Sequence, residues 1–305
     1  MPCFVIGAAP HRLFHGTTTP APRETPTRPP LPPPAPPEVE SSDFDFIGVL
    51  GEGGFARVFK VRHRRTCEVF ALKEAFNPSP DAEEEAEVLR RAASSPSPHV
   101  VQCHAVFLGG NDDDNNGALV VSVLELMDAG SLRAVLRRLQ RRGFLEPALA
   151  EAAHRCLMGL AQLHSRGVAH LDVKPDNFLC NARGDVKIGD FNASRPRAVR
   201  ARPADVWGLG VTVLELFLGR PPVWPDAVEK PKKCDWKEVI CDRDPPSVPE
   251  YVDASPELRH FVAACLHKDP ARRARVPHLL RHPFVTGRDV EASSRALRDL
   301  IVENL

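Results

Sequence analysis

The chain has 305 residues, enough for one large domain or for two lobes with a sizeable core. Lys plus Arg and Asp plus Glu each number 40, so the net charge favours neither nucleic acid nor a membrane surface as a partner. The composition, with 43% hydrophobic residues, is typical of a soluble globular protein. No apolar run approaches the roughly 18 residues of a membrane span. The start of the chain lacks the basic region of a signal peptide, so we expect none.

The eight cysteines are scattered along the chain and form no C-x-x-C pair. This spacing fits neither a disulfide framework nor a zinc site, and it favours a reducing compartment. We therefore expect a cytoplasmic location, with the nucleus as the alternative. The basic run at 62–65 lies in a predicted hairpin, where we interpret it as a solvated turn rather than a nuclear signal.

Residues 1–42 form a proline-rich arm with its densest run at 29–34. Proline fixes φ and lacks an N–H group, so we expect this arm to be extended or disordered. Two interpretations stay open, and the simple spacer is favoured. The other is a docking arm, because Arg23, Arg28 and Leu31 place basic and apolar groups on a pre-extended chain.

Residues 43–128 predict a small β-rich lobe with a single helix over 81–93. Short runs rich in β-branched and aromatic residues, bounded by glycines or polar clusters, indicate strands over 44–50, 56–62, 68–73, 100–108 and 118–126. The gap at 109–117 is rich in Gly, Asn and Asp, which predicts a solvated hairpin tip. Its three aspartates lack the spacing of a calcium loop.

Residues 129–287 predict a larger, mostly helical lobe, followed by a C-terminal helix in 288–305. Apolar residues between Leu149 and Leu160 recur at helical spacing, and similar patterns cover 204–218, 256–267, 276–281 and 290–305. We interpret His154 and His164 as surface or boundary residues rather than metal ligands. The sequence therefore predicts an α+β fold of two lobes, with a ligand site between them.

A glycine-rich turn joins the first two predicted strands: Leu50, Gly51, Glu52, Gly53, Gly54, Phe55, Ala56, Arg57 and Val58. Glycines without Cβ atoms let backbone N–H groups approach phosphates. A dinucleotide-binding turn would need a helix next, but 57–61 reads as a strand. In the following strand, Lys73 needs anionic partners, and we expect these to be phosphates and Glu85 of the helix.

The most specific motif runs from His170 to Leu179. Its Asp172 is placed to accept the proton of an attacking hydroxyl, Lys174 to neutralise a transferring phosphoryl group, and Asn177 to bind a metal. Asp190 follows a short predicted strand and offers the hard oxygen ligand that magnesium requires. Asn177 and Asp190 are 13 residues apart, as a hairpin that brings both to one ion would require.

Together, and in this order, the four motifs resemble the protein kinase signature. The resemblance covers about 43–284 and implies ATP and Mg²⁺ as cofactors. It implies a hinge at 124–132 with Leu124 as gatekeeper, adenine contacts near Glu125 and Met127, and an adenine ring enclosed by Val58, Ala71 and Leu179. Lys174 marks serine/threonine kinases, with dual specificity left open. The features at 127–132, the Leu280–Phe284 ending and the arm are most similar to plant mitogen-activated protein kinase kinases.

The chain also departs from this family. Only 15 positions separate Asp190 from Asp205, so the activation segment is short by about twenty residues. No A-P-E motif is present, which predicts that Arg273 has lost the glutamate it normally pairs with. Ser194 is the only hydroxyl residue of the segment, and Ala56, Leu171 and Asn192 replace two glycines and an arginine of the motifs.

Two functional hypotheses follow. The leading one is a protein kinase that transfers phosphate to a protein hydroxyl, with a mitogen-activated protein kinase as the expected substrate. The alternative is an ATP-binding pseudokinase scaffold that docks a downstream kinase, because the substrate platform is incomplete. The segment is either truly short or reduced by a missing exon, and the sequence alone does not choose between these explanations.

Overall fold

The computed structural model describes residues 43–54, 56–75, 82–92, 95–109, 119–140, 142–222 and 244–303. The chain divides into two units, Met1–Glu38 and Val39–Leu305. The predicted proline-rich arm and almost all of the predicted hairpin tip at 109–117 lie outside the described residues. Within these residues, no helix has the length and apolar character needed to cross a membrane.

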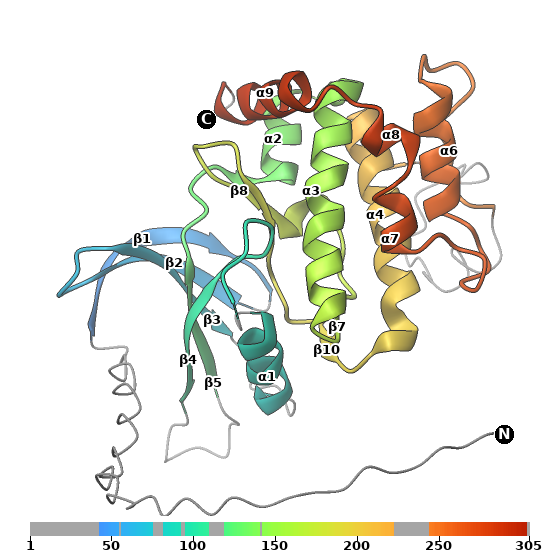
Figure 1. Ribbon diagram of the computed structural model, residues 1–305. Helices are drawn as coiled ribbons and strands as arrows, with labels where there is room; N and C mark the ends of the chain where they lie inside the picture. Colours follow the sequence, from blue (N-terminus) through green and yellow to red (C-terminus); the bar gives the residue numbers. More distant parts are fainter. Residues whose placement is uncertain are drawn as a thin grey trace, which may run out of the picture. The chain divides into compact units, whose positions relative to one another are not determined.

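A five-stranded antiparallel sheet forms the small lobe, in the spatial order β1-β2-β3-β5-β4 (Figure 1). Its elements are β1 (Phe44–Glu52), β2 (Ala56–His63), β3 (Val69–Ala75), β4 (Cys103–Gly109) and β5 (Leu119–Glu125). The helix α1 (Ala82–Ala92) packs beside β4 and β5. All five predicted strands and the predicted helix are confirmed, with ends shifted by up to three residues.

The large lobe is a set of helices around α3 (Glu146–Ser165), most of whose length is buried. The others are α2 (Leu132–Arg138), α4 (Arg202–Leu218), α6 (Pro256–Cys265), α7 (Val276–Leu279), α8 (Pro283–Thr286) and α9 (Val290–Val302). Four leucines of α3 have no exposed surface: Leu149, Leu157, Leu160 and Leu163. Burying each contributes roughly 1.5–3 kcal/mol, so α3 anchors the core of this lobe.

Short strands position the segments that carry the motifs. A small sheet has the order β6-β8-β9, with β6 (Gly130–Ser131), β8 (Phe178–Cys180) and β9 (Val186–Ile188). The hairpin expected between Asn177 and Asp190 is thus present as β8 and β9. The β9 strand also bonds to the small lobe, because Ile188 donates to the carbonyl of His99 at 2.9 Å and Val101 donates to that of Ile188 at 2.9 Å.

The C-terminal helix α9 packs across α3, which confirms the amphipathic helix predicted there (Figure 1). Leu297 and Ile301 are buried on its inner face. A buried carboxylate of α3, Glu151, accepts from Arg155 at 2.8 Å, from Arg288 at 2.9 Å and from Ser294 at 3.0 Å. This cluster attaches the end of the chain to the large lobe.

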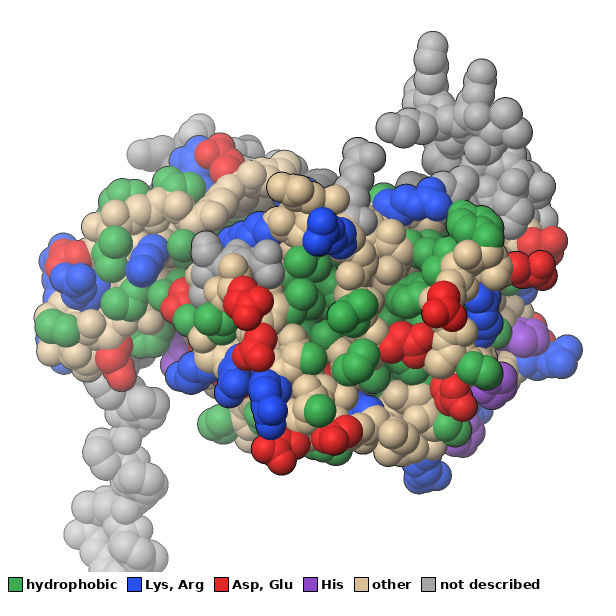
Figure 2. Space-filling view, turned by 90° about the horizontal axis from the view of Figure 1, so that it is seen from above, with side chains coloured by type: hydrophobic (Ala, Val, Ile, Leu, Met, Phe, Trp, Pro, Cys, Tyr) green, Lys and Arg blue, Asp and Glu red, His purple; other side chains and the backbone are tan. Residues whose placement is uncertain are grey.

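Charged side chains are mixed over the face shown in Figure 2, where basic and acidic groups alternate with hydrophobic ones. No single sign of charge dominates this view. The equal numbers of acidic and basic residues are therefore reflected in their distribution over this face.

The small β-rich lobe and the larger helical lobe confirm the α+β fold of two lobes that the sequence predicted.

Candidate active site

Asp205 of α4 fixes the shape of the catalytic loop. Its fully buried carboxylate accepts the N–H of His170 at 3.0 Å and that of Leu171 at 2.7 Å. These bonds hold Leu171 in the left-handed region at φ 66°, a conformation that costs a non-glycine residue on the order of 1–3 kcal/mol. His164 Nε2 lies 2.7 Å from the same carboxylate. The boundary histidine of the sequence prediction therefore helps to stabilise a buried charge.

Three predicted catalytic-loop residues meet at one carboxylate. Lys174 Nζ donates to Asp172 Oδ2 at 2.7 Å. The amide Nδ2 of Asn177 donates to the same oxygen at 2.9 Å and to the backbone carbonyl of Asp172 at 2.7 Å. Asp172 is about one third exposed, so it is held in place while remaining reachable by a substrate hydroxyl.

Arg133 of α2 anchors the catalytic loop to α4. The sequence did not reveal this role. Its Nε donates to Asp176 at 3.1 Å and its guanidinium pairs with the buried carboxylate of Glu215. The bonds to Glu215 raise the pKa of Arg133, and burial opposes this effect. The partners are 43 and 82 positions away in sequence, so no local pattern signals their contact.

His170 joins the catalytic loop to the segment of Asp190. Its Nε2–H donates to the carbonyl of Gly189 at 2.9 Å, and its ring packs against Phe191 with centroids 5.8 Å apart. The other ring nitrogen accepts from the N–H of Asp172 at 3.3 Å, which requires a neutral imidazole. Burial lowers the pKa of His170 and favours this neutral form.

Lys73 of β3 reaches across to the large lobe and binds two acceptors there. Its ammonium donates to Asp190 Oδ1 at 2.7 Å and to Asn192 Oδ1 at 2.7 Å. Burial on its own would raise the pKa of Asp190, but the nearby ammonium outweighs this effect and the net shift is downward. Asp190 is therefore an ionised carboxylate bonded to Lys73, a contact that the sequence did not predict, since phosphates and Glu85 were the expected partners of this lysine.

The predicted partner of Lys73 on α1 stays a prediction, because the side chain of Glu85 lies outside the described residues. Its neighbour Glu84 lies 3.8 Å from Arg195 of the short activation segment. The sequence did not foresee the contact between Lys73 and Asn192. The sequence did carry a signal for this contact, because Asn192 brings a side-chain acceptor to a position where the motif normally has glycine.

The glycine-rich turn lies between β1 and β2, where Gly51 pairs with Val58 and Glu52 with Arg57. A Cβ at Gly51 or Gly54 would meet nothing within 4 Å, and none of the three turn glycines has a positive φ. Neither packing nor backbone strain thus requires glycine here. Open backbone next to the site is what an approaching phosphate group would need. Phe55 lies outside the described residues.

The predicted adenine-contacting residues come from both lobes and from the connection that follows β5. Ala71 is buried and pairs in register with Leu124. The N–H of Glu125 already donates to Gln102 at 2.8 Å, and its carboxylate binds Lys187 at 2.6 Å. Among the described hydrogen bonds, none uses the backbone of Met127, so its N–H and C=O are available to an adenine ring. Of the remaining predicted contacts, Leu50 is exposed, and Val58 and Leu179 are half-buried.

The donor set suits magnesium better than a transition metal. Within the described residues, no group of three or more His, Cys, Asp or Glu side chains could hold an ion on its own. Asp190 is ionised, and Asn177 uses its amide nitrogen in bonds to Asp172, which leaves the amide oxygen for a cation. Two oxygen ligands supplemented by phosphate and water oxygens match the preference of magnesium.

The short activation segment is held by local contacts. Its β10 strand (Arg195–Pro196) pairs with β7 (Val168–Ala169), the strand that follows α3. Ser194 is 1% exposed and donates through Oγ to the carbonyl of His170 at 3.0 Å. The only hydroxyl group of this segment is therefore buried and bonded, which removes it as an accessible phosphorylation site in this conformation.

Arg273 has hydrogen-bond partners, but none of those described is a carboxylate. The sequence predicted that it lacks its glutamate, and it instead donates to three backbone carbonyls: Pro203 at 2.7 Å, His267 at 2.9 Å and Lys268 at 3.2 Å. Its guanidinium also stacks over Trp207, 4.9 Å from the ring centroid. The charge is thus hydrogen-bonded but not neutralised by an anion.

The fold and the assembled motifs define a protein kinase, and the protein kinase domain family matches residues 44–200 and 196–285. Mitogen-activated protein kinase kinase 10 of Arabidopsis thaliana is 35% identical, over 92% of this chain and 94% of its own length. Mitogen-activated protein kinase kinase 9 of the same plant is 33% identical, over 81% of this chain and 86% of its own length. The chain belongs to the mitogen-activated protein kinase kinases within the protein kinase family.

This result confirms the resemblance inferred from the motifs. The chain is a protein kinase, and the expected class of phosphotransferase and serine/threonine kinase is confirmed with it. Protein kinases in general use ATP and Mg²⁺.

Proposed function

We propose that the chain is an active, ATP- and Mg²⁺-dependent serine/threonine kinase, with dual specificity left open, whose substrate is a mitogen-activated protein kinase. The observation that carries this proposal is the joint position of Asp172, Lys174 and Asn177 around one carboxylate, with Lys73 bonded to Asp190 beside them. The names of the relatives support this class of substrate.

Each side chain has a defined role in this proposal. Asp172 would orient the substrate hydroxyl and accept its proton, while Lys174 would neutralise charge on the transferring group. Asn177 and Asp190 would hold Mg²⁺, and Lys73 would contact the phosphates while Asp190 turns to the metal. The bound nucleotide and metal supply the phosphoryl group and its charge neutralisation.

A second candidate function is the ATP-binding scaffold, and the short activation segment favours it. The buried Ser194 and the missing A-P-E motif leave less surface for aligning a protein substrate. In either case we propose that residues 1–42 act as a spacer, with a docking arm as the alternative, and that the protein is cytoplasmic, with the nucleus as the alternative.

The test is transfer of labelled phosphate from ATP to a panel of purified mitogen-activated protein kinases in the presence of magnesium. The matched control is Asp172→Asn, which keeps the size of the side chain and removes the base. Labelling by the native chain alone supports the enzyme. Nucleotide binding with equal, background labelling by both proteins supports the scaffold.

A further inference from the structure

A groove of about 720 Å³ lies outside the proposed nucleotide site, where α3 ends and α4 begins. The turn before α7 forms its opposite wall. Its apolar surface includes Val199, Pro203, Val206 and Val276. Val199 is 57% exposed, so the groove offers apolar surface to solvent.

The charged side chains that line the groove are all basic. Four arginines line it: Arg200, Arg202, Arg273 and Arg275. His164 lies among them, and no Asp or Glu is among the described residues that form its lining. Such a concentration of guanidinium groups without carboxylates attracts anions.

Hydrogen bonds to backbone carbonyls hold two of these arginines, Arg273 and Arg202, in place. Arg273 is 8% exposed, and its hydrogen bonds go to backbone carbonyls rather than to an anion. Burial lowers the pKa of Arg273, while Cys265 and Asp269 act in the opposite direction. Among the described residues Arg273 forms no ion pair with a carboxylate, and burying such a cation is unfavourable, so a carboxylate supplied from outside would relieve part of that cost.

Arg202 adds an unsatisfied donor. Its Nε is buried and has no hydrogen-bond partner among the described residues, although the guanidinium also donates to the carbonyl of His164. Arg202 begins α4, whose first turn has no side-chain cap. The one acidic residue of this turn, Asp205, is fully buried and bonded to His164, His170 and Leu171, and it forms no ion pair with Arg202.

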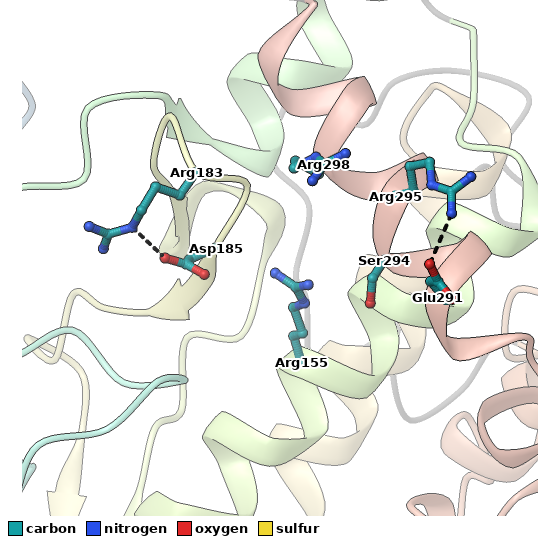
Figure 3. Close-up of a pocket in the computed structure, with 7 residues that line it drawn as sticks. All are labelled: Arg155, Arg183, Asp185, Glu291, Ser294, Arg295 and Arg298. Carbon is teal, nitrogen blue, oxygen red and sulfur yellow. Dashed lines mark hydrogen bonds and ion pairs between the residues drawn. The ribbon is translucent and has the colours of Figure 1, made fainter.

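In a second pocket rich in arginine, two of the arginines are paired with carboxylates of the same pocket (Figure 3). There Arg183 pairs with Asp185 at 3.2 Å and Arg295 pairs with Glu291 at 3.2 Å. The two carboxylates belong to the same pocket and pair with two of its four arginines. The groove at α4 lacks such internal anions, so complementarity there must come from a ligand.

We propose that this groove binds an extended acidic segment of a partner protein, with a carboxylate on Arg202 and Arg273 and apolar side chains over Val199 and Val206. Charge complementarity selects the acidic character, and the apolar floor selects a peptide over a small anion. The groove includes Arg200 of the activation segment, so a partner bound there contacts the shortened platform itself. This inference does not depend on catalytic activity.

The test is fluorescence anisotropy of the full chain with the labelled peptide Ala-Val-Pro-Glu-Val-Glu-Ala, beside its counterpart with both Glu replaced by Gln. We expect the acidic peptide to bind more tightly, and Arg202→Gln to weaken it about tenfold, which corresponds to about 1.4 kcal/mol. The matched control Arg295→Gln in the paired pocket should leave binding unchanged. Urea unfolding of each variant verifies that the fold is intact.

Equal binding of both peptides, or unchanged binding by Arg202→Gln and Arg275→Gln, would overturn the proposal. Sedimentation velocity tests a second copy as the occupant. Self-association of the native chain that disappears in Arg202→Gln would also contradict an acidic partner segment.

Discussion

At the scale of residues, the contact of Lys73 with Asn192 distinguishes this site. The asparagine stands where the motif normally has glycine, and its Oδ1 accepts from the ammonium at 2.7 Å. Lys73 therefore has a neutral acceptor in addition to Asp190. This second bond ties the start of the activation segment to the small lobe.

Replacing Asn192 by Gly should remove this bond and lower the free energy of unfolding by about 1–2 kcal/mol, since hydrogen bonds to charged groups contribute about 1.5–3 kcal/mol when well formed. Urea unfolding measures the change. The control Ala193→Gly introduces the same backbone freedom without removing an acceptor. A loss as large in the control as in Asn192→Gly would attribute the effect to the glycine alone.

Asp205 is the second residue on which the site depends. Asp205→Asn places an amide nitrogen opposite a backbone N–H of the catalytic loop, so one of the bonds to His170 or Leu171 must fail. We expect a loss of about 2–4 kcal/mol in unfolding free energy, given the cost of an unsatisfied buried group. The exposed Asp253→Asn should stay within about 0.5 kcal/mol, and equal effects of the two variants would refute this role.

At the scale of elements, the longer strands and helices could be predicted because their periodicity extends over many residues. The strands β10 and β7 could not, since two residues carry no periodic pattern. The motifs predicted the identity of Asp172, Asn177 and Asp190. Their mutual orientation depends on Asp205 and Arg133, whose contacts join distant positions. The carbonyl partners of Arg273 are likewise backbone atoms, which sequence patterns do not encode.

Four buried or half-buried histidines make the fold sensitive to acid, three of them in the large lobe and one, His99, in the small lobe. Burial is the largest cause of the lowered pKa of His99, His154, His170 and His282. The unfolded chain takes up these protons below about pH 6.5, whereas the folded chain resists doing so until lower pH. Stability should therefore be full above pH 6.5 and fall as the pH decreases, by up to about 1.4 kcal/mol per pH unit for each histidine.

Urea unfolding at pH 7.5 and pH 5.5 measures this dependence. His154 is the best single variant, because its Nδ1 is buried without a hydrogen-bond partner among the described residues. His154→Leu should reduce the difference between the two pH values. An unchanged difference would show that His154 does not contribute.

At the scale of the whole molecule, the structure joins a well-assembled catalytic loop to a short activation segment. The segment is held by the β10–β7 pairing, by Ser194 and by the bond of Arg197 to the carbonyl of Gly167 at 2.7 Å. None of these contacts involves a phosphate group. The segment thus adopts its described conformation through protein contacts alone, and phosphatase treatment should not lower the activity of the chain.

The most direct measurement is therefore single-turnover phosphoryl transfer by phosphatase-treated protein to a mitogen-activated protein kinase, with magnesium and saturating ATP. The native chain should transfer phosphate, and Asp172→Asn should be slower by roughly 10²–10⁴, the usual contribution of a general base. Equal rates for the two proteins, at the level of the reaction without enzyme, would contradict the claim that this site catalyses phosphoryl transfer.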